Sequence, residues 1–361
     1  MKKILFIIPL LCFYLNLFAQ HRDSENLARK LEWDDSKLNI LIDTRIDLQA
    51  SFLNGDLENR TFRANILKLW LVGDITPSIH YRVRQRLNTP QTSLRDNYSI
   101  ATDQAWVSFD IDPKWTITVG KQAVQFGTFE YDYSGADVYL ETMIYNDLDD
   151  SKTGVNVAYR IAGQTMNVQV VNSDAPQFAS DEYKNKALAI NLLWVGSLLD
   201  GKVKTRWGYG AFQHTESKFY NWVTLGTQLN IKKFTAELDY YIGDRNMDYS
   251  AIINNSGLGE RYVKDQSASI NMKYDFGKWK PSVKTVWNER YDKDFRSDAY
   301  QSKGLEAVME CYPFTNKVTK DLRFHAAYMY SRMKFKGEFV DIASTNTQTL
   351  LVGTRWMFKV K

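Results

Sequence analysis

The residues best suited to solute chemistry form a basic stripe in the segment 78–87. Alternate positions carry four basic side chains: His80, Arg82, Arg84 and Arg86. The positions between them carry apolar or aromatic side chains: Ile79, Tyr81, Val83 and Leu87. Because successive side chains of a strand point to opposite faces, the four basic groups would share one face. Such a row could attract anions, or it could pair with carboxylates and only hold a wall together, and the pattern favours both interpretations equally.

An arginine row of this kind cannot face lipid, where each arginine costs roughly 2–4 kcal/mol at the bilayer midplane. It would have to face a water-filled lumen. Other predicted strands carry basic residues that we expect on the same inner surface: Arg45, Lys204, Arg206, Lys284, Arg323 and Arg355. Acidic residues on these inner faces balance them: Asp43, Asp47, Asp110, Glu237, Asp239, Glu306 and Glu310.

The longest predicted connection, 127–152, is strongly acidic. It holds one lysine, Lys152, and these carboxylates: Glu130, Asp132, Asp137, Glu141, Asp147, Asp149 and Asp150. We expect this segment to be a pore loop in which four of them form a constriction: Glu130, Asp132, Asp137 and Glu141. An acidic loop opposite a basic wall would set a transverse field and limit any preference for anions. Asp149 and Asp150 could instead bind a divalent cation, but a solvated loop is the commoner arrangement.

Signatures of enzymes and metal sites are missing from the sequence. It contains no Gly-x-Ser-x-Gly, His-Glu-x-x-His, Cys-x-x-Cys or phosphate-loop motif. None of the histidines, His21, His80, His214 and His325, has another His or Cys at metal-ligand spacing. We therefore predict no catalytic residue, no metal and no cofactor.

The elements that would position the charged side chains are strands with period-two alternation. The segment 38–52 alternates over its whole length, with Leu41 as the one apolar residue on its polar face. Globular strands usually span about five or six residues, so this length suits a tilted strand that crosses a membrane. The C-terminal segment 350–360 alternates in the same way. Fourteen further strands bring the predicted total to sixteen: 61–72, 78–87, 103–110, 115–126, 153–161, 165–173, 187–194, 203–213, 221–230, 234–243, 265–274, 279–288, 302–311 and 321–333.

The connections between these segments are alternately long and short. The longer set comprises 53–60, 88–102, 127–152, 174–186, 214–220, 244–264, 289–301 and 334–346. The shorter set comprises 73–77, 111–114, 162–164, 195–202, 231–233, 275–278 and 312–320. Bacterial outer-membrane barrels have short periplasmic turns and longer external loops, so we expect the longer set outside the cell.

The composition also favours a barrel. The chain is 14% aromatic, yet its mean hydropathy is −0.41. After the N-terminus it has no apolar run long enough for a membrane-spanning helix. In lipid every backbone polar group must be paired, so a sheet there has to close on itself. We therefore predict an all-β fold, a transmembrane antiparallel β-barrel of about 16 strands over residues 38–361.

The N-terminus has the features of an export signal. Lys2 and Lys3 precede an apolar run that ends in Leu-Phe-Ala at 17–19. We expect 1–19 to be a cleaved signal peptide and 20–37 a periplasmic segment. Without 1–19 the chain has 44 Lys+Arg, two fewer than the 46 of the full sequence, against 42 Asp+Glu. This balance does not indicate nucleic-acid binding, and the one remaining cysteine, Cys311, cannot form an intramolecular disulfide.

Several motifs resemble one family of bacterial channels. They are DQAWVSF at 103–109, VGKQ and FG within 115–127, FEYDY at 129–133 and TGVNVAYR at 153–160. These segments are similar to the phosphate/pyrophosphate-selective porins of the O and P type, and in particular to their Bacteroidota branch. The resemblance implies a 16-stranded barrel, usually a homotrimer, that passes small anions. It also implies an arginine ladder, matched here by His80, Arg82, Arg84 and Arg86, and a constriction lysine cluster, which the single Lys152 of 127–152 does not match.

We therefore expect an outer-membrane porin, in contact with membrane lipid, that passes small hydrophilic solutes with a weak bias toward anions. Three alternatives stay open. A barrel enzyme such as a phospholipase needs a Ser–His pair at the outer rim, where His214 is the available histidine. A structural or adhesin barrel would have a filled lumen and no conductance. A secreted β-sandwich would be soluble without detergent.

Overall fold

The computed structural model describes residues 37–88, 101–148, 151–248 and 259–360. The predicted signal peptide 1–19 lies outside these residues, and so do 20–36 of the predicted periplasmic segment and the Asp149–Asp150 pair. Within the described residues, no helix is long and apolar enough to cross a membrane.

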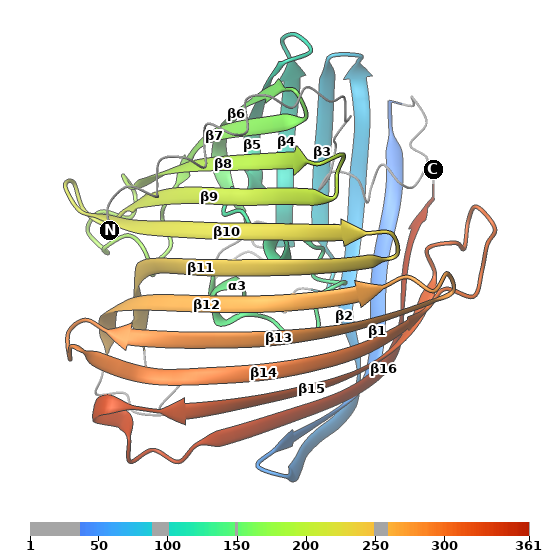
Figure 1. The fold of residues 1–361 in the computed structure, drawn as a ribbon. Helices are drawn as coiled ribbons and strands as arrows, with labels where there is room; N and C mark the ends of the chain where they lie inside the picture. The colour runs from blue at the N-terminus through green and yellow to red at the C-terminus, as the bar shows by residue number, and fades with distance from the viewer. Residues whose placement is uncertain (1–36, 89–100, 149–150, 249–258, 361) are drawn as a thin grey trace.

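The described residues form sixteen strands in one closed antiparallel sheet (Figure 1). The strands are β1 (Asn39–Leu53), β2 (Asp56–Thr76), β3 (Ile79–Arg86), β4 (Thr102–Asp110), β5 (Trp115–Ala123), β6 (Ser151–Ile161), β7 (Gln164–Asn172), β8 (Leu188–Leu198), β9 (Val203–Gln213), β10 (Phe219–Ile231), β11 (Phe234–Asp248), β12 (Glu260–Tyr274), β13 (Trp279–Asp292), β14 (Ser297–Cys311), β15 (Arg323–Phe335) and β16 (Thr345–Lys359). Each pairs with its neighbours in sequence, and β1 pairs with β16. The predicted all-β barrel of sixteen strands is confirmed.

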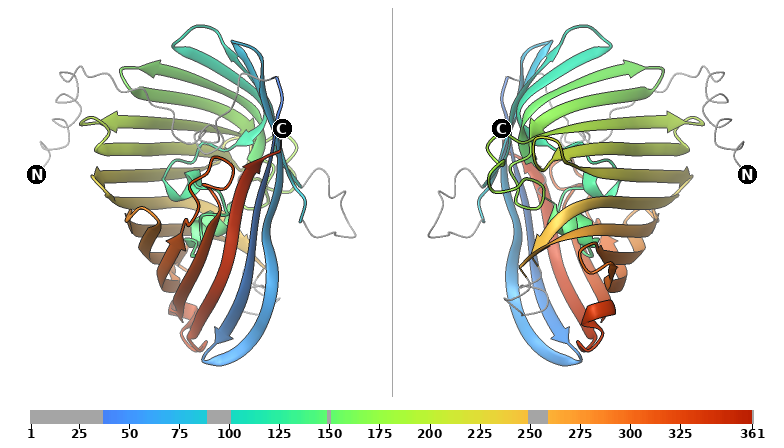
Figure 2. Two further views of the ribbon diagram at one scale, coloured as in Figure 1. Left: turned by 90° about the vertical axis from the view of Figure 1, so that its right-hand side faces the viewer. Right: turned by 90° about the vertical axis from the view of Figure 1, so that its left-hand side faces the viewer.

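The barrel wall places charged side chains inside and apolar side chains outside. On β1, Asp43, Arg45 and Asp47 are at most 4% exposed, whereas Ile46 and Leu48 are 47% and 42% exposed. This is the reverse of a soluble protein, and it suits a wall that contacts lipid on its outer face. Side views show the strands running obliquely around the closed barrel (Figure 2).

Leu41, the apolar exception on the polar face of β1, packs inside the barrel. It forms a buried cluster with Trp70, Val72 and Met357, which come from the neighbouring strands β2 and β16. The inner surface therefore contains an apolar patch at this end of β1, which explains why a single apolar residue interrupts the alternation.

The predicted loop 53–60 is wrong, because β1 and β2 are joined by the two-residue hairpin Asn54–Gly55. Both residues have positive φ, +52° at Asn54 and +99° at Gly55. Asn-Gly is favoured in tight hairpins because both residues tolerate this conformation.

Other connections also differ from the prediction. Strands β11 to β14 extend further than predicted, so the loop predicted at 244–264 begins after Asp248 and ends before Glu260, and 289–301 shrinks to 293–296. By contrast, the short turn predicted at 312–320 lengthens to 312–322. The alternation of long and short connections is therefore weaker than the sequence pattern suggested. Extended strands can project beyond the lipid, so the apolar pattern alone does not mark their ends.

Candidate functional site

The described part of the connection between β5 and β6, residues 124–148, runs inside the barrel (Figures 1 and 2). It contains two short helices, η2 (Glu130–Asp132) and α3 (Met143–Asp147). Phe126 and Ile144 of this inner connection join a buried cluster with Phe212, Trp222 and Tyr241 of the wall. These wall residues form a second apolar and aromatic patch on the inner face, and the inner connection covers it.

The backbone of the inner connection lies directly against the wall. A Cβ atom at Gly226 of β10 would lie 2.6 Å from the Cα of Thr128, so only glycine permits this approach. The Thr128 N–H donates to the Arg206 carbonyl oxygen at 3.0 Å. The Asp239 carboxylate accepts the N–H groups of Phe129 at 2.9 Å and Glu130 at 2.7 Å.

Four carboxylates of the inner connection form ion pairs with wall cations. The pairs are Glu130–Lys284 (2.7 Å), Asp132–Arg206 (3.1 Å), Asp137–Arg323 (2.6 Å) and Asp147–Arg245 (2.6 Å). The cations belong to β9, β11, β13 and β15. The acidic character of 127–152 therefore serves largely to fasten the segment to this part of the wall.

Burial and neighbouring charges shift the pKa values of several groups in the inner connection. Burial opposes ionisation of Asp137, but Arg355 and Arg323 outweigh it and hold the carboxyl pKa below its ordinary value. Burial and the Glu237 carboxylate raise the pKa of Tyr133, whose hydroxyl donates a hydrogen bond to Glu237. Burial, assisted by the charge of Glu130, also raises the pKa of Glu141.

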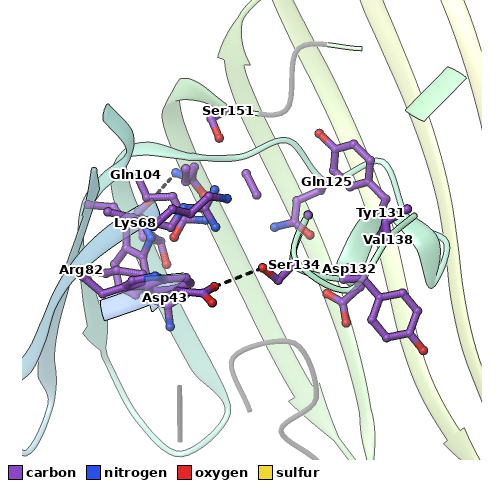
Figure 3. A pocket seen from close by; sticks show the side chains of 18 of the residues that line it. Asp43, Lys68, Arg82, Gln104, Gln125, Tyr131, Asp132, Ser134, Val138 and Ser151 are labelled. Atoms are coloured by element: carbon purple, nitrogen blue, oxygen red, sulfur yellow. Dashed lines mark hydrogen bonds between the residues drawn. The ribbon is translucent and has the colours of Figure 1, made fainter. Parts of the chain in front are cut away.

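A cavity of about 1700 Å³ remains between the inner connection and a wall formed mainly by β1 to β9. In the close view of this cavity, Lys68, Arg82 and Gln104 lie on one side, and Tyr131 and Asp132 lie on the other (Figure 3). The inner connection and the basic stripe therefore face each other across open space.

One stretch of the wall side of the cavity, on β2 and β3, is basic. Lys68, Arg82, Arg84 and Arg86 all line it. Asp103 of β4 contacts three of these cations: Lys68 at 3.5 Å, Arg84 at 2.9 Å and Arg86 at 2.5 Å. A single carboxylate carries one negative charge, so Asp103 cannot neutralise the three cations that it contacts.

Two tryptophans hold the central arginines of this basic wall. The Arg82 guanidinium lies 5.5 Å from the ring centroid of Trp70 and 5.1 Å from that of Trp106. The Arg84 guanidinium lies 5.1 Å from the Trp70 centroid. The sheet register makes this stacking possible, because Trp70 is directly opposite Arg84, and Arg82 is opposite Trp106. Cation–π contacts of this kind attract the guanidinium groups to the indole rings.

His80 lines the same cavity but has a different environment. Its Nδ1 lies 2.5 Å from the Asp74 carboxylate, and its Nε2 lies 3.1 Å from the Asp110 carboxylate. Two carboxylates thus surround one imidazole, so His80 contributes no excess positive charge. Of the four residues in the predicted stripe, only the three arginines give the wall its basic character.

The remaining predicted residues divide between the cavity and the anchors of the inner connection. Arg45 and Arg206 line the cavity, together with Asp132 and Glu141 of the predicted constriction. Arg323, Glu130 and Asp137 are ion-paired between the inner connection and the wall, outside the cavity lining. Lys204 also lies outside that lining. In the described part of the chain, the Glu141 carboxylate has no ion pair within 4 Å.

Sequence reasoning missed four residues of the basic wall: Lys68, Trp70, Asp103 and Trp106. Lys68 and Trp70 lie on the inner face of β2, where an alternation with Leu67, Leu69 and Leu71 marked them as inward-facing. Their proximity to Arg84 and Arg86 depends on the register between β2 and β3, which the sequence pattern does not specify.

Comparison with known proteins identifies related chains. The family model described as phosphate-selective porin O and P matches residues 37–358. No curated protein matches the chain in sequence.

Solved structures with a similar fold are outer-membrane proteins. The outer-membrane channel DcaP of Acinetobacter baumannii has a TM-score of 0.61 at 11% identity, covering 90% of this chain and 99% of that one. A loop L8 deletion mutant of OmpT from Vibrio cholerae has a TM-score of 0.60 at 14% identity, covering 90% and 100%. The trimer form of OmpT from the same organism has a TM-score of 0.59 at 12% identity, covering 90% and 100%. At these identities the likeness concerns the fold alone.

Proposed function

Since this chain belongs to the phosphate-selective porin O and P family and forms an outer-membrane β-barrel, we propose that it is a passive diffusion channel biased toward small anions. As a porin it is a channel and not an enzyme, so the phospholipase-like alternative does not apply. The observation that carries the proposed bias is the set of cations on the cavity wall: Lys68, Arg82, Arg84 and Arg86.

The inner connection opposes this bias less than the sequence suggested. Four of its carboxylates are engaged with cations on β9, β11, β13 and β15. Glu141 lines the cavity without such a pair among the described residues. Charges in a low-dielectric wall act on a passing ion more strongly than charges on an open surface. A solute in the cavity therefore meets more fixed positive charge than the composition of 127–152 implies.

The arrangement of the whole chain is part of the proposal. Residues 1–19 act as the signal peptide, 20–37 as a periplasmic segment, and 127–152 as the pore loop of the barrel formed by 38–361. The functional assembly is a homotrimer, which the family implies and which the trimer form of OmpT, a protein of similar fold, makes reasonable. The cavity favours an open channel over a structural barrel with a filled lumen.

Planar-bilayer recording of the purified protein tests the proposed channel. In a potassium chloride gradient, the zero-current potential should shift toward the chloride equilibrium potential. Absence of conductance would support the structural barrel instead. Saturable block of chloride current by inorganic phosphate would show a dedicated phosphate site in place of a general bias.

A further inference from the structure

The two faces of the cavity differ in chemistry. One face carries the cations of the basic wall. The other is formed by the inner connection, where Tyr131, Val138, Tyr145 and Leu148 line the cavity beside the acidic residues Asp132 and Glu141. In Figure 3, Tyr131 and Val138 lie across the open space from Arg82 and Lys68. A solute between them contacts positive charge on one side, and on the other it contacts aromatic and apolar surface beside two acidic residues.

The tyrosine rings are held in fixed orientations. The Tyr131 ring packs edge-on against Tyr145, with centroids 6.0 Å apart at 77°. It also packs edge-on against Phe126, with centroids 5.1 Å apart at 79°. Tyr131 and Tyr145 are only partly buried, so ring surface is available to a solute in the cavity.

The guanidinium groups opposite these rings are also oriented. Arg82 lies over the rings of Trp70 and Trp106, and Arg84 lies over that of Trp70. The N–H groups of each guanidinium extend in its plane. In-plane N–H pairs match the two oxygens of a carboxylate or a phosphate. The basic wall can therefore bind an anionic head group by its geometry as well as by its charge.

We propose that this cavity prefers organic anions that carry an aromatic ring, an inference that rests on the anion-biased channel proposed above. An inorganic anion gains only the attraction of the basic wall. A ring-bearing anion also packs against Tyr131 and Tyr145 and removes apolar surface from water. The anionic head group is a carboxylate or a phosphate, since the oxygens of either group can accept hydrogen bonds from the guanidinium N–H groups.

Block of chloride current in planar bilayers tests this preference with matched pairs of anions. Benzoate is compared with acetate, and phenyl phosphate with methyl phosphate, so that each pair differs in the ring. We expect the ring-bearing member to reach half-block at a concentration about two- to tenfold lower, the range that one aromatic contact provides. Tyr145→Leu should remove most of this difference.

A matched control uses a tyrosine outside the lumen. Tyr240 of β11 lies between the buried Asp239 and Tyr241 and faces outward, so Tyr240→Leu should leave the preference intact. If the wild type is anion-selective but the two members of each pair reach half-block at the same concentration, this inference alone is overturned. A wild type without anion selectivity would overturn the proposed function itself. Equal loss of preference in Tyr240→Leu would show that the rings act through barrel stability.

Discussion

Replacing Lys284 with methionine removes a cation that fastens the inner connection to β13. The Lys284 ammonium lies 2.7 Å from Glu130 Oε1 and donates to the Leu140 carbonyl oxygen at 2.6 Å. The side chains of Lys284 and Glu130 are 6% and 2% exposed. Methionine keeps most of the side-chain length, so the main loss is the charge.

The expected cost follows from what remains around Glu130. The Thr142 N–H and hydroxyl still donate to its carboxylate, at 2.9 Å and 2.6 Å, and so does the Tyr241 hydroxyl at 3.1 Å. Removing one partner of a buried ion pair costs about 3–5 kcal/mol. Because three hydrogen bonds survive, we expect the free energy of unfolding to fall by about 3 kcal/mol, the lower end of that range.

Urea unfolding in lipid vesicles, followed by tryptophan fluorescence, measures this change. The double variant K284M/E130Q should recover part of the loss, because it no longer buries an uncompensated carboxylate. Lys280 of the same strand is the matched control: it pairs with Asp275 at 3.3 Å, and the two side chains are 40% and 50% exposed. K280M should therefore cost less than about 1 kcal/mol. Equal losses in K284M and K280M, or no recovery in the double variant, would refute the reasoning.

Three other outcomes are expected. Because burial and Glu130 raise the pKa of Glu141, this acid becomes neutral at a higher pH than an ordinary glutamate. The anion preference, measured by the zero-current potential, should therefore rise as the pH falls through that pKa. Glu141→Gln should flatten this pH dependence. His80→Gln removes the imidazole that contacts the Asp74 and Asp110 carboxylates, so the potential should move toward cation preference; an unchanged potential would mean that the imidazole does not act on the passing ions. Gly55→Ala should lower the free energy of unfolding by about 1–2 kcal/mol through its positive φ of +99°, and an unchanged urea midpoint would contradict a strained hairpin.

The barrel could be predicted from sequence because one physical requirement governs every strand. Lipid on one side and water on the other impose period-two alternation, and closure requires each strand to pair on both edges. The same rule placed Arg82, Arg84 and Arg86 on the lumen side. It did not mark where strands end, since residues beyond the lipid need not alternate in polarity. For this reason the Asn54–Gly55 hairpin was mistaken for part of a loop.

The chemistry of the lumen was less predictable, because it depends on which side chains meet across strands. Asp137 and Arg323 are 186 residues apart in sequence, yet their side chains lie 2.6 Å from each other. Composition alone suggested that the carboxylates of 127–152 face the arginines of β3. In the folded chain, most of the described carboxylates of this segment instead pair with cations on β9, β11, β13 and β15. Lys68 joined the basic wall only through the register between β2 and β3.

The most direct test of the proposed anion bias compares the wild type with R82A/R84A/R86A. The measured quantity is the zero-current potential of purified protein in a planar bilayer under a potassium chloride gradient. These three arginines line the cavity, so we expect the potential to move from the chloride side toward the potassium equilibrium potential while the channel still conducts. A potential that stays at its wild-type value would contradict the account, because it would show that these arginines hold the wall together without acting on the passing ions.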